Sequence, residues 1–260
     1  MKKLILLLLF IPFLSLAQIS KFSANNVQEF KSWMNYAELE NKAVIIDFVA
    51  DWCGPCKTMD KQLWNSEEFK LLKNYIFIEV DIDKNTQLAR KYGITSIPRV
   101  IVEVANNQKD VLIDKLGFRS KNQHLNELQY VNQFDLKEVY LANNESEYGS
   151  AYRNLFLTDK KKSYTTLLKL SSKHFKKALK KEKNTINQLN IIYNLKLKGS
   201  SKKANKNLEK LKLDKANLSE IENEIVQNII INSDRIISFI LVAIRYDEFS
   251  EFIQRPIQNY

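Results

Sequence analysis

An apolar run at residues 43–50 leads directly into a Cys-Gly-Pro-Cys segment at residues 53–56. The run is short and rich in β-branched residues, which predicts a buried strand. Apolar residues then recur at helical spacing over residues 54–73, with Pro55 in a first turn that does not need its N–H. The segment therefore predicts a strand that ends beside a helix start, with both cysteines at that joint.

The placement of the cysteines points to thiol–disulfide exchange. A helix N-terminus has unpaired N–H groups and a partial positive charge, which lower the pKa of a thiol at Cys53. The thiolate is the species that attacks disulfides, and Gly54 leaves the approach to it uncrowded. Cys56 lies one turn later and is placed to attack the mixed disulfide and release the product. This chemistry needs no cofactor besides the Cys53–Cys56 pair.

Asp47 is an acidic residue in the middle of the apolar strand. Burial raises the pKa of a carboxyl, and a raised carboxyl behind Cys56 can accept and return the proton of that thiol. We therefore expect Asp47 to act as the acid–base group of the site. The alternative is a structural aspartate that faces solvent at a strand edge.

The flanking patterns complete an α/β unit in the order α-β-α-β-α-β-β-α. The expected helices cover residues 22–38, 54–73, 86–92 and 121–133. The expected strands cover residues 43–50, 75–80, 99–104 and 111–116, the last two as a hairpin. This order predicts a mixed sheet with helices on both faces.

Residues 45–57 resemble the thioredoxin active-site segment almost position by position, and residues 91–98 resemble the cis-proline loop of that family. Gly117 before the last helix also has a counterpart, so the resemblance covers residues 22–133. It implies a thioredoxin fold, protein disulfides as substrates, and a cis Pro98 that exposes the backbone of Ile97 to an extended substrate. The implied substrate-binding residues are Trp52, Gly54, Pro55, Ile97 and Pro98.

Four positions depart from the family pattern. Val49 replaces a second tryptophan, Lys61 replaces a helix-kinking proline, and Arg99 replaces a small residue. Glu79 stands where the family carries the lysine beside the buried aspartate, so the partner of Asp47 stays open. Residues 57–69 are closer to secreted relatives such as the periplasmic C-terminal domain of DsbD-type reductant carriers.

The first 17 residues read as a secretory signal peptide. Two lysines precede an apolar run at residues 4–14, and small residues end at Ala17, where we expect the cut. The run is shorter than the ~20 residues of a membrane-spanning helix, although an uncleaved anchor is the alternative. We expect a periplasmic or secreted protein with no integral membrane span in the mature chain. The resemblance implies a membrane thiol reductant as its electron donor.

Residues 134–260 differ in character, since Gly149, Gly199 and Pro256 are their only strong breakers. Helical patterns recur, and Ser219 with Glu222 forms a capping box. We expect an all-α domain of four to six helices, which gives a signal peptide at 1–17, a thioredoxin-like domain at 18–133 and a Lys-rich helical domain at 134–260.

Residues 159–215 carry 18 lysines and four acids. A solvated face explains them better than an anionic partner, and we expect no nucleic acid.

Other functions fit some of the same residues. Gly54 and Pro55 supply no charged group to stabilise a thiolate, which favours a reductase or isomerase over a disulfide-forming oxidase. A partner-binding or chaperone module that docks through the helical domain is the alternative outside enzymes. A structural disulfide is disfavoured because it would close a very short loop. A metal site built from the cysteines with His124 and His174 is disfavoured because the histidines lack ligand spacing.

Overall fold

The structure is a computed structural model that describes residues 19–211, with the exception of residues 107, 160–163 and 184. The expected signal peptide at residues 1–17 lies outside this range. The chain divides into two compact units, the first ending at Leu136 and the second beginning at Lys137.

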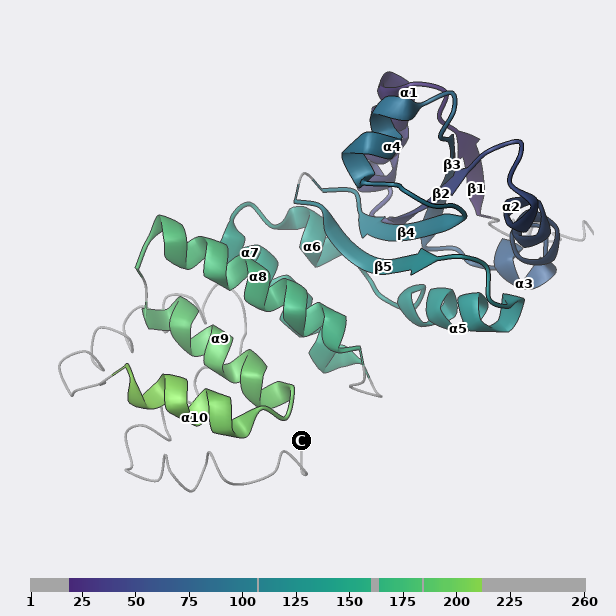
Figure 1. Cartoon of the computed structure of the whole chain (residues 1–260). Coiled ribbons are helices and arrows are strands. Elements are labelled where there is room, and N and C mark those ends of the chain that lie inside the picture. Colours follow the sequence, from purple (N-terminus) through teal and green to yellow (C-terminus); the bar gives the residue numbers. More distant parts are fainter. Residues whose placement is uncertain (1–18, 107, 160–163, 184, 212–260) are drawn as a thin grey trace, which may run out of the picture. The chain divides into compact units, whose positions relative to one another are not determined.

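A five-stranded mixed sheet forms the centre of the first unit (Figure 1). Its strands are β1 Ser20–Ser23, β2 Ala43–Val49, β3 Tyr75–Asp81, β4 Arg99–Val104 and β5 Asp110–Leu116. The spatial order is β1-β3-β2-β4-β5, in which β1, β3 and β2 run parallel and β4 runs antiparallel to both β2 and β5. The hairpin expected from the sequence is confirmed.

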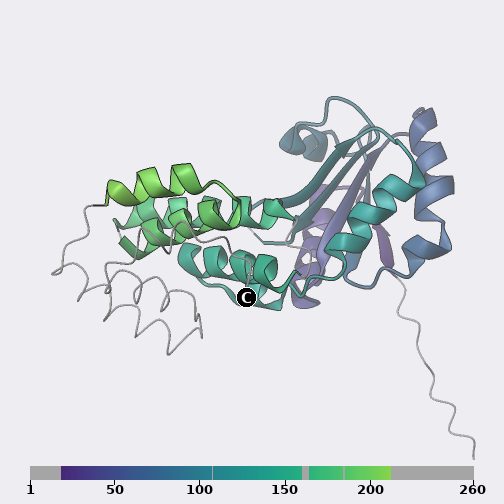
Figure 2. The ribbon, with the colours of Figure 1, turned by 90° about the horizontal axis from the view of Figure 1, so that it is seen from below.

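Helices cover both faces of this sheet (Figures 1 and 2). They are α1 Val27–Leu39, α2 Gly54–Met59, the π-helical turn η1 Asp60–Trp64, α3 Glu67–Lys70, α4 Thr86–Tyr92 and α5 Lys121–Val131. Phe48 of β2 packs on Tyr92 of α4, with ring centroids 5.4 Å apart. Its neighbour Asp47 points to the opposite face, where Trp64 of η1 packs on Phe77 of β3 at 5.0 Å. The expected mixed α/β architecture is therefore confirmed.

The first element differs from the expectation. The helical pattern assigned to residues 22–38 begins only at Val27, and the preceding segment is strand β1. Asn26 caps the helix, because its side chain accepts a hydrogen bond from the N–H of Glu29 at 2.9 Å. Phe22, which fits the helical spacing, lies on β1 and stacks on Trp33 of α1 with ring centroids 3.8 Å apart.

The single helix expected over residues 54–73 is also broken. It passes from α2 into the π-helical turn η1, ends there, and restarts as α3. Ser66 has an extended backbone, and its hydroxyl accepts the N–H of Phe69 at 3.3 Å, which starts the new helix. The π-helical turn η1 buries both Leu63 and Trp64.

The second unit is helical as expected. The structure describes five helices within residues 137–211, apart from the gaps given above: α6 Lys137–Leu141, α7 Glu145–Thr158, α8 Thr165–Lys181, α9 Thr185–Leu197 and α10 Ser201–Glu209. The helix expected to start at the capping box of Ser219 lies outside the described residues.

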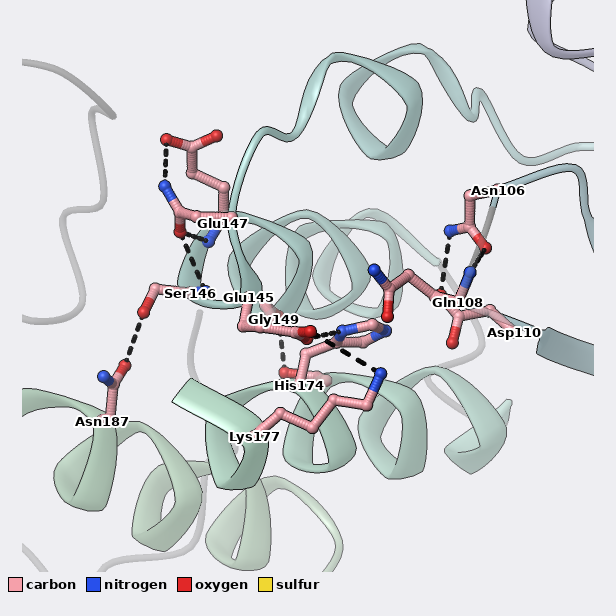
Figure 3. A network of polar contacts seen from close by, with 12 residues as sticks. Asn106, Gln108, Asp110, Glu145, Ser146, Glu147, Gly149, His174, Lys177 and Asn187 are labelled. Carbon is pink, nitrogen blue, oxygen red and sulfur yellow. Dashed lines mark hydrogen bonds and ion pairs between the residues drawn. The ribbon is translucent and has the colours of Figure 1, made fainter. Parts of the chain in front are cut away.

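Gly149 lies inside α7 and does not break it, contrary to the expectation. A Cβ at this position would lie 2.8 Å from the ring of Phe175 on α8. Two further polar contacts join these helices (Figure 3). Ser171 donates to the Gly149 carbonyl at 2.6 Å, and the His174 ring bonds to the Glu145 carboxyl at 2.6 Å. A side chain at position 149 would therefore separate the two helices.

Candidate active site

Cys53 and Cys56 lie where β2 leads into α2, and they are joined by a disulfide. Cys53 caps the helix, because its sulfur accepts the N–H of Cys56 at 3.1 Å. The pair packs in a small apolar cluster with Ala50, and the half-buried Ile82 and Ile97 border it. The disulfide thus sits in a low-polarity setting at the N-terminus of a helix.

The two residues between the cysteines leave the approach open. Pro55 stands in the first turn of α2, where its missing N–H costs no hydrogen bond. Gly54 is exposed, and a Cβ built there would meet no atom within 4 Å. The space beside the Gly54 Cα is therefore free of other atoms of the described chain.

Trp52 precedes the pair and is 67% exposed. Its indole N–H donates to the Asp83 carboxylate at 2.7 Å, so the large ring is held in one orientation at the surface. Asp83 follows β3 and is fixed in turn, because its N–H donates to the Asp81 carboxylate at 2.9 Å. Sequence reasoning did not identify Asp83, since this contact spans 31 residues of chain.

Ile97, which precedes Pro98, borders the cysteine pair. The peptide bond between Ile97 and Pro98 is cis, and Ile97 packs against the cysteine cluster. The Pro98 carbonyl accepts the N–H of Gly117 at 2.8 Å. Arg99, which departs from the family pattern, donates two hydrogen bonds to Asp114 of β5 at 2.5 and 2.7 Å. Its charge is therefore engaged across the hairpin.

Asp47 is buried, with 1% of its surface exposed. Burial raises its pKa from 3.8 to about 8, while a hydrogen bond from the indole N–H of Trp64 at 2.7 Å acts in the opposite direction. Its second oxygen, Oδ1, has no hydrogen-bond partner among the described residues. With a pKa of about 8, this carboxyl is mostly protonated near neutral pH, and its ionised fraction can accept a proton from a thiol.

Asp47 has one hydrogen-bond partner and one nearby cation, and these come from different elements. The direct partner is Trp64, whose aromatic character alone gave no sign of this role in the sequence. The nearby cation is Lys21 of β1, whose ammonium donates to the backbone carbonyl of Trp64 and lowers the pKa of Asp47 by its charge. Glu79 raises the pKa of Asp47, because it is the register partner of that residue on β3 and carries a like charge.

Each histidine considered for a metal site has another neighbour. His124 of α5 stacks on Phe118 at 5.6 Å, and His174 of α8 bonds to Glu145 (Figure 3). In the part of the chain that the structure describes, no three His, Cys, Asp or Glu side chains gather as metal ligands would. Over the same residues, no helix combines the length and the apolar character that crossing a membrane requires.

Comparison with known proteins places this site in context. The family profile described as thioredoxin matches residues 22–129. The thioredoxin of Mycoplasmoides gallisepticum is 37% identical over 94 residues, which are 34% of this chain and 89% of that protein. The thioredoxin of Rickettsia felis is 36% identical over 102 residues, 38% of this chain and 90% of that protein. The solved reduced thioredoxin pre-protein of Schistosoma mansoni is 28% identical, covers 42% of this chain and 96% of its own, and has a TM-score of 0.34.

Proposed function

Because the chain belongs to the thioredoxin family, we propose that it reduces or isomerises protein disulfides outside the cytoplasm, with electrons supplied by a membrane thiol carrier. The reaction class is that of the family: the protein is a thiol–disulfide oxidoreductase with a redox-active disulfide. The expected thioredoxin fold, followed by a helical extension, is confirmed.

One observation carries the proposal: the Cys53–Cys56 disulfide caps a helix beside a buried carboxyl and an open approach over Gly54. In the reduced form, the Cys53 thiolate attacks one sulfur of a substrate disulfide and releases the other as a thiolate. Cys56 then loses its proton to Asp47 and attacks Cys53, which releases the second substrate thiol and restores the enzyme disulfide. The cysteine pair carries both electrons, so this cycle uses no other cofactor.

The segment between the cysteines supports the reductive direction. Gly54 and Pro55 offer no positive group to stabilise the Cys53 thiolate, and a strong oxidant depends on such stabilisation of its reduced form. Ile97 packs on the cysteine cluster, and Trp52, next to Cys53 in the chain, exposes its ring, and these apolar and aromatic surfaces suit an unfolded or extended protein segment. These features support a protein substrate more than a small thiol.

The reduction potential of the pair in glutathione buffers tests the direction. A value near the thioredoxin level of about −270 mV supports a reductase that is fed with electrons. A value near −120 mV, roughly the level of strong oxidants, makes a disulfide-forming oxidase the function instead. A Cys53→Ser variant that keeps full cellular activity would favour the partner-binding alternative.

Location and substrates need separate experiments. A cleaved signal peptide predicts that the purified native protein begins directly after Ala17, which N-terminal sequencing reads; an intact Met1 contradicts cleavage and leaves the uncleaved anchor. A Cys56→Ser variant retains the attacking thiol and lacks the resolving one, so substrates and electron donor accumulate as mixed disulfides on Cys53. Partners captured by Cys56→Ser and absent from a Cys53→Ser/Cys56→Ser control are the proteins that exchange electrons with this chain.

A further inference from the structure

Asp47 and Glu79 face the same covered side of the sheet. They are register partners on the parallel strands β2 and β3. Phe77, two residues before Glu79 on β3, lies on this face beneath the ring of Trp64. Asp47 is fully enclosed here, whereas Glu79 is only half-buried and lies one strand closer to the sheet edge formed by β1. Of the two neighbouring carboxyl groups, Asp47 is therefore the interior one and Glu79 the one nearer to solvent.

Lys21 places a positive charge near these two carboxyl groups. Its ammonium donates to the carbonyl of Trp64 and lies 3.5 Å from the amide oxygen of Asn65. It also lies 5.3 and 5.5 Å from the ring centres of Phe69 and Phe77. These contacts hold the lysine over the aromatic floor that also supports Asp47. Edge strand β1 thus supplies the cation that neither β2 nor β3 contains on this face.

Acids outnumber cations around Asp47 itself. Glu79 of β3 and Asp60 of η1 act on it as like charges, and Lys21 is the cation that opposes them. Glu79 additionally faces Asp81 and Lys84, while Lys70 of α3 faces Lys21. Burial and the neighbouring acids raise the pKa of Glu79 as well. The pKa values of both carboxyl groups are therefore raised, so each group holds a proton more readily than an ordinary carboxyl, as a proton relay between them requires.

We propose that Glu79 carries the proton of Asp47 to and from solvent, with Lys21 as the counter-charge of the pair. The inference rests on the proposed acid–base role of Asp47. When Cys56 attacks, its thiol proton passes to the Asp47 carboxylate, then through one bridging water to the Glu79 carboxylate, since the two carboxyls share no hydrogen bond, and then to solvent. Re-reduction by the electron donor reverses this path and returns one proton to the Cys56 thiolate. Glu79 is thus a positioning residue for proton exchange, and it touches no sulfur.

The test compares full-length Glu79→Gln and Glu79→Asp variants in single turnover. The reduced protein is mixed with glutathione disulfide, and the rate that no longer rises with disulfide concentration reports the attack by Cys56. We expect this rate to fall about tenfold in Glu79→Gln below pH 8, to recover on addition of formate or imidazole, and to stay near wild type in Glu79→Asp. Glu127→Gln, a change at a half-buried acid of α5 that is paired with Lys115, is the matched control and should leave the rate unchanged.

A purely electrostatic role predicts the opposite sign. Without its negative neighbour, Asp47 has a lower pKa and is ionised more often, so Cys56 would react faster in Glu79→Gln. The indole N–H of Trp64 reports this pKa by NMR, because it bonds directly to the Asp47 carboxyl. A lowered pKa with a faster or unchanged rate overturns the relay. If Asp47→Asn also leaves the rate unchanged, the proposed role of Asp47 fails first; a slow Asp47→Asn with a normal Glu79→Gln refutes the relay alone.

Discussion

Replacing Asp47 by asparagine should stabilise the oxidised protein at neutral pH and above. The pKa of Asp47 is about 8 in the folded chain and 3.8 in its ordinary state. The stability contributed by the protonated form is therefore complete below pH 4 and is lost as the pH rises through 8. This loss amounts to roughly 6 kcal/mol above pH 8 and about 4 kcal/mol at pH 7.

The amide avoids the ionisation cost and introduces a smaller one. It keeps an oxygen to accept the Trp64 indole, but its NH₂ group takes the place of Oδ1, which has no partner among the described residues. An unpaired buried donor costs about 1–3 kcal/mol. Asp47→Asn should therefore be about 1–3 kcal/mol more stable at pH 7, and its advantage should grow by about 4 kcal/mol between pH 4 and pH 7.

Urea unfolding of the full chain, followed by tryptophan fluorescence from pH 4 to pH 9, measures this difference. Trp33, Trp52 and Trp64 are the three tryptophans of the chain, and all belong to the first unit, so the signal reports that unit. Asp51→Asn, a change at an exposed acid, is the matched control. Stability curves of Asp47→Asn and wild type that run parallel over this pH range would refute the reasoning.

Single contacts support three further predictions. Trp64→Phe removes the hydrogen bond to Asp47 and should raise the pKa of that carboxyl by about one to two units, read from its ¹³C resonance. Gly149→Ala forces a methyl group against the Phe175 ring and should destabilise the helical unit by about 1–2 kcal/mol after the gain in helix propensity, measured by circular dichroism. Ser66→Ala removes the cap of α3 and should cost about 1 kcal/mol in urea unfolding.

The parts of the fold that local signals encode could be predicted from the sequence. The apolar run before Cys53 and the proline after it specify a strand and a helix start within a few residues of each other. The turn of α4 into its left-handed Gly93 is equally local, because only glycine adopts that conformation freely. The strand and the helix start around Cys53 carry the cysteine pair, so local sequence signals alone are enough to locate the centre of the candidate site.

The parts of the fold that depend on contacts between residues far apart in the chain could not be predicted from the sequence. Strand β1 has four residues, and Phe22 fits a helical or an extended pattern until its pairing with β3 decides. Lys21 reaches Trp64 across 43 residues of chain, a contact that no spacing rule contains. Gly149 was expected to break a helix, because the need for a close approach by Phe175 exists only once α7 and α8 are packed.

The proposed role of Lys21 makes strand β1, the first described element, part of the chemistry. The strand starts at Ser20, just after the processing site expected at Ala17, and the family match begins only at residue 22. A protein shortened to that match would keep both cysteines and lose Lys21 together with half of the edge strand. With Lys21 as the proposed counter-charge, trimming the chain past this strand would change proton transfer at Asp47 while leaving the redox motif intact. Heterologous versions should therefore begin no later than Ile19.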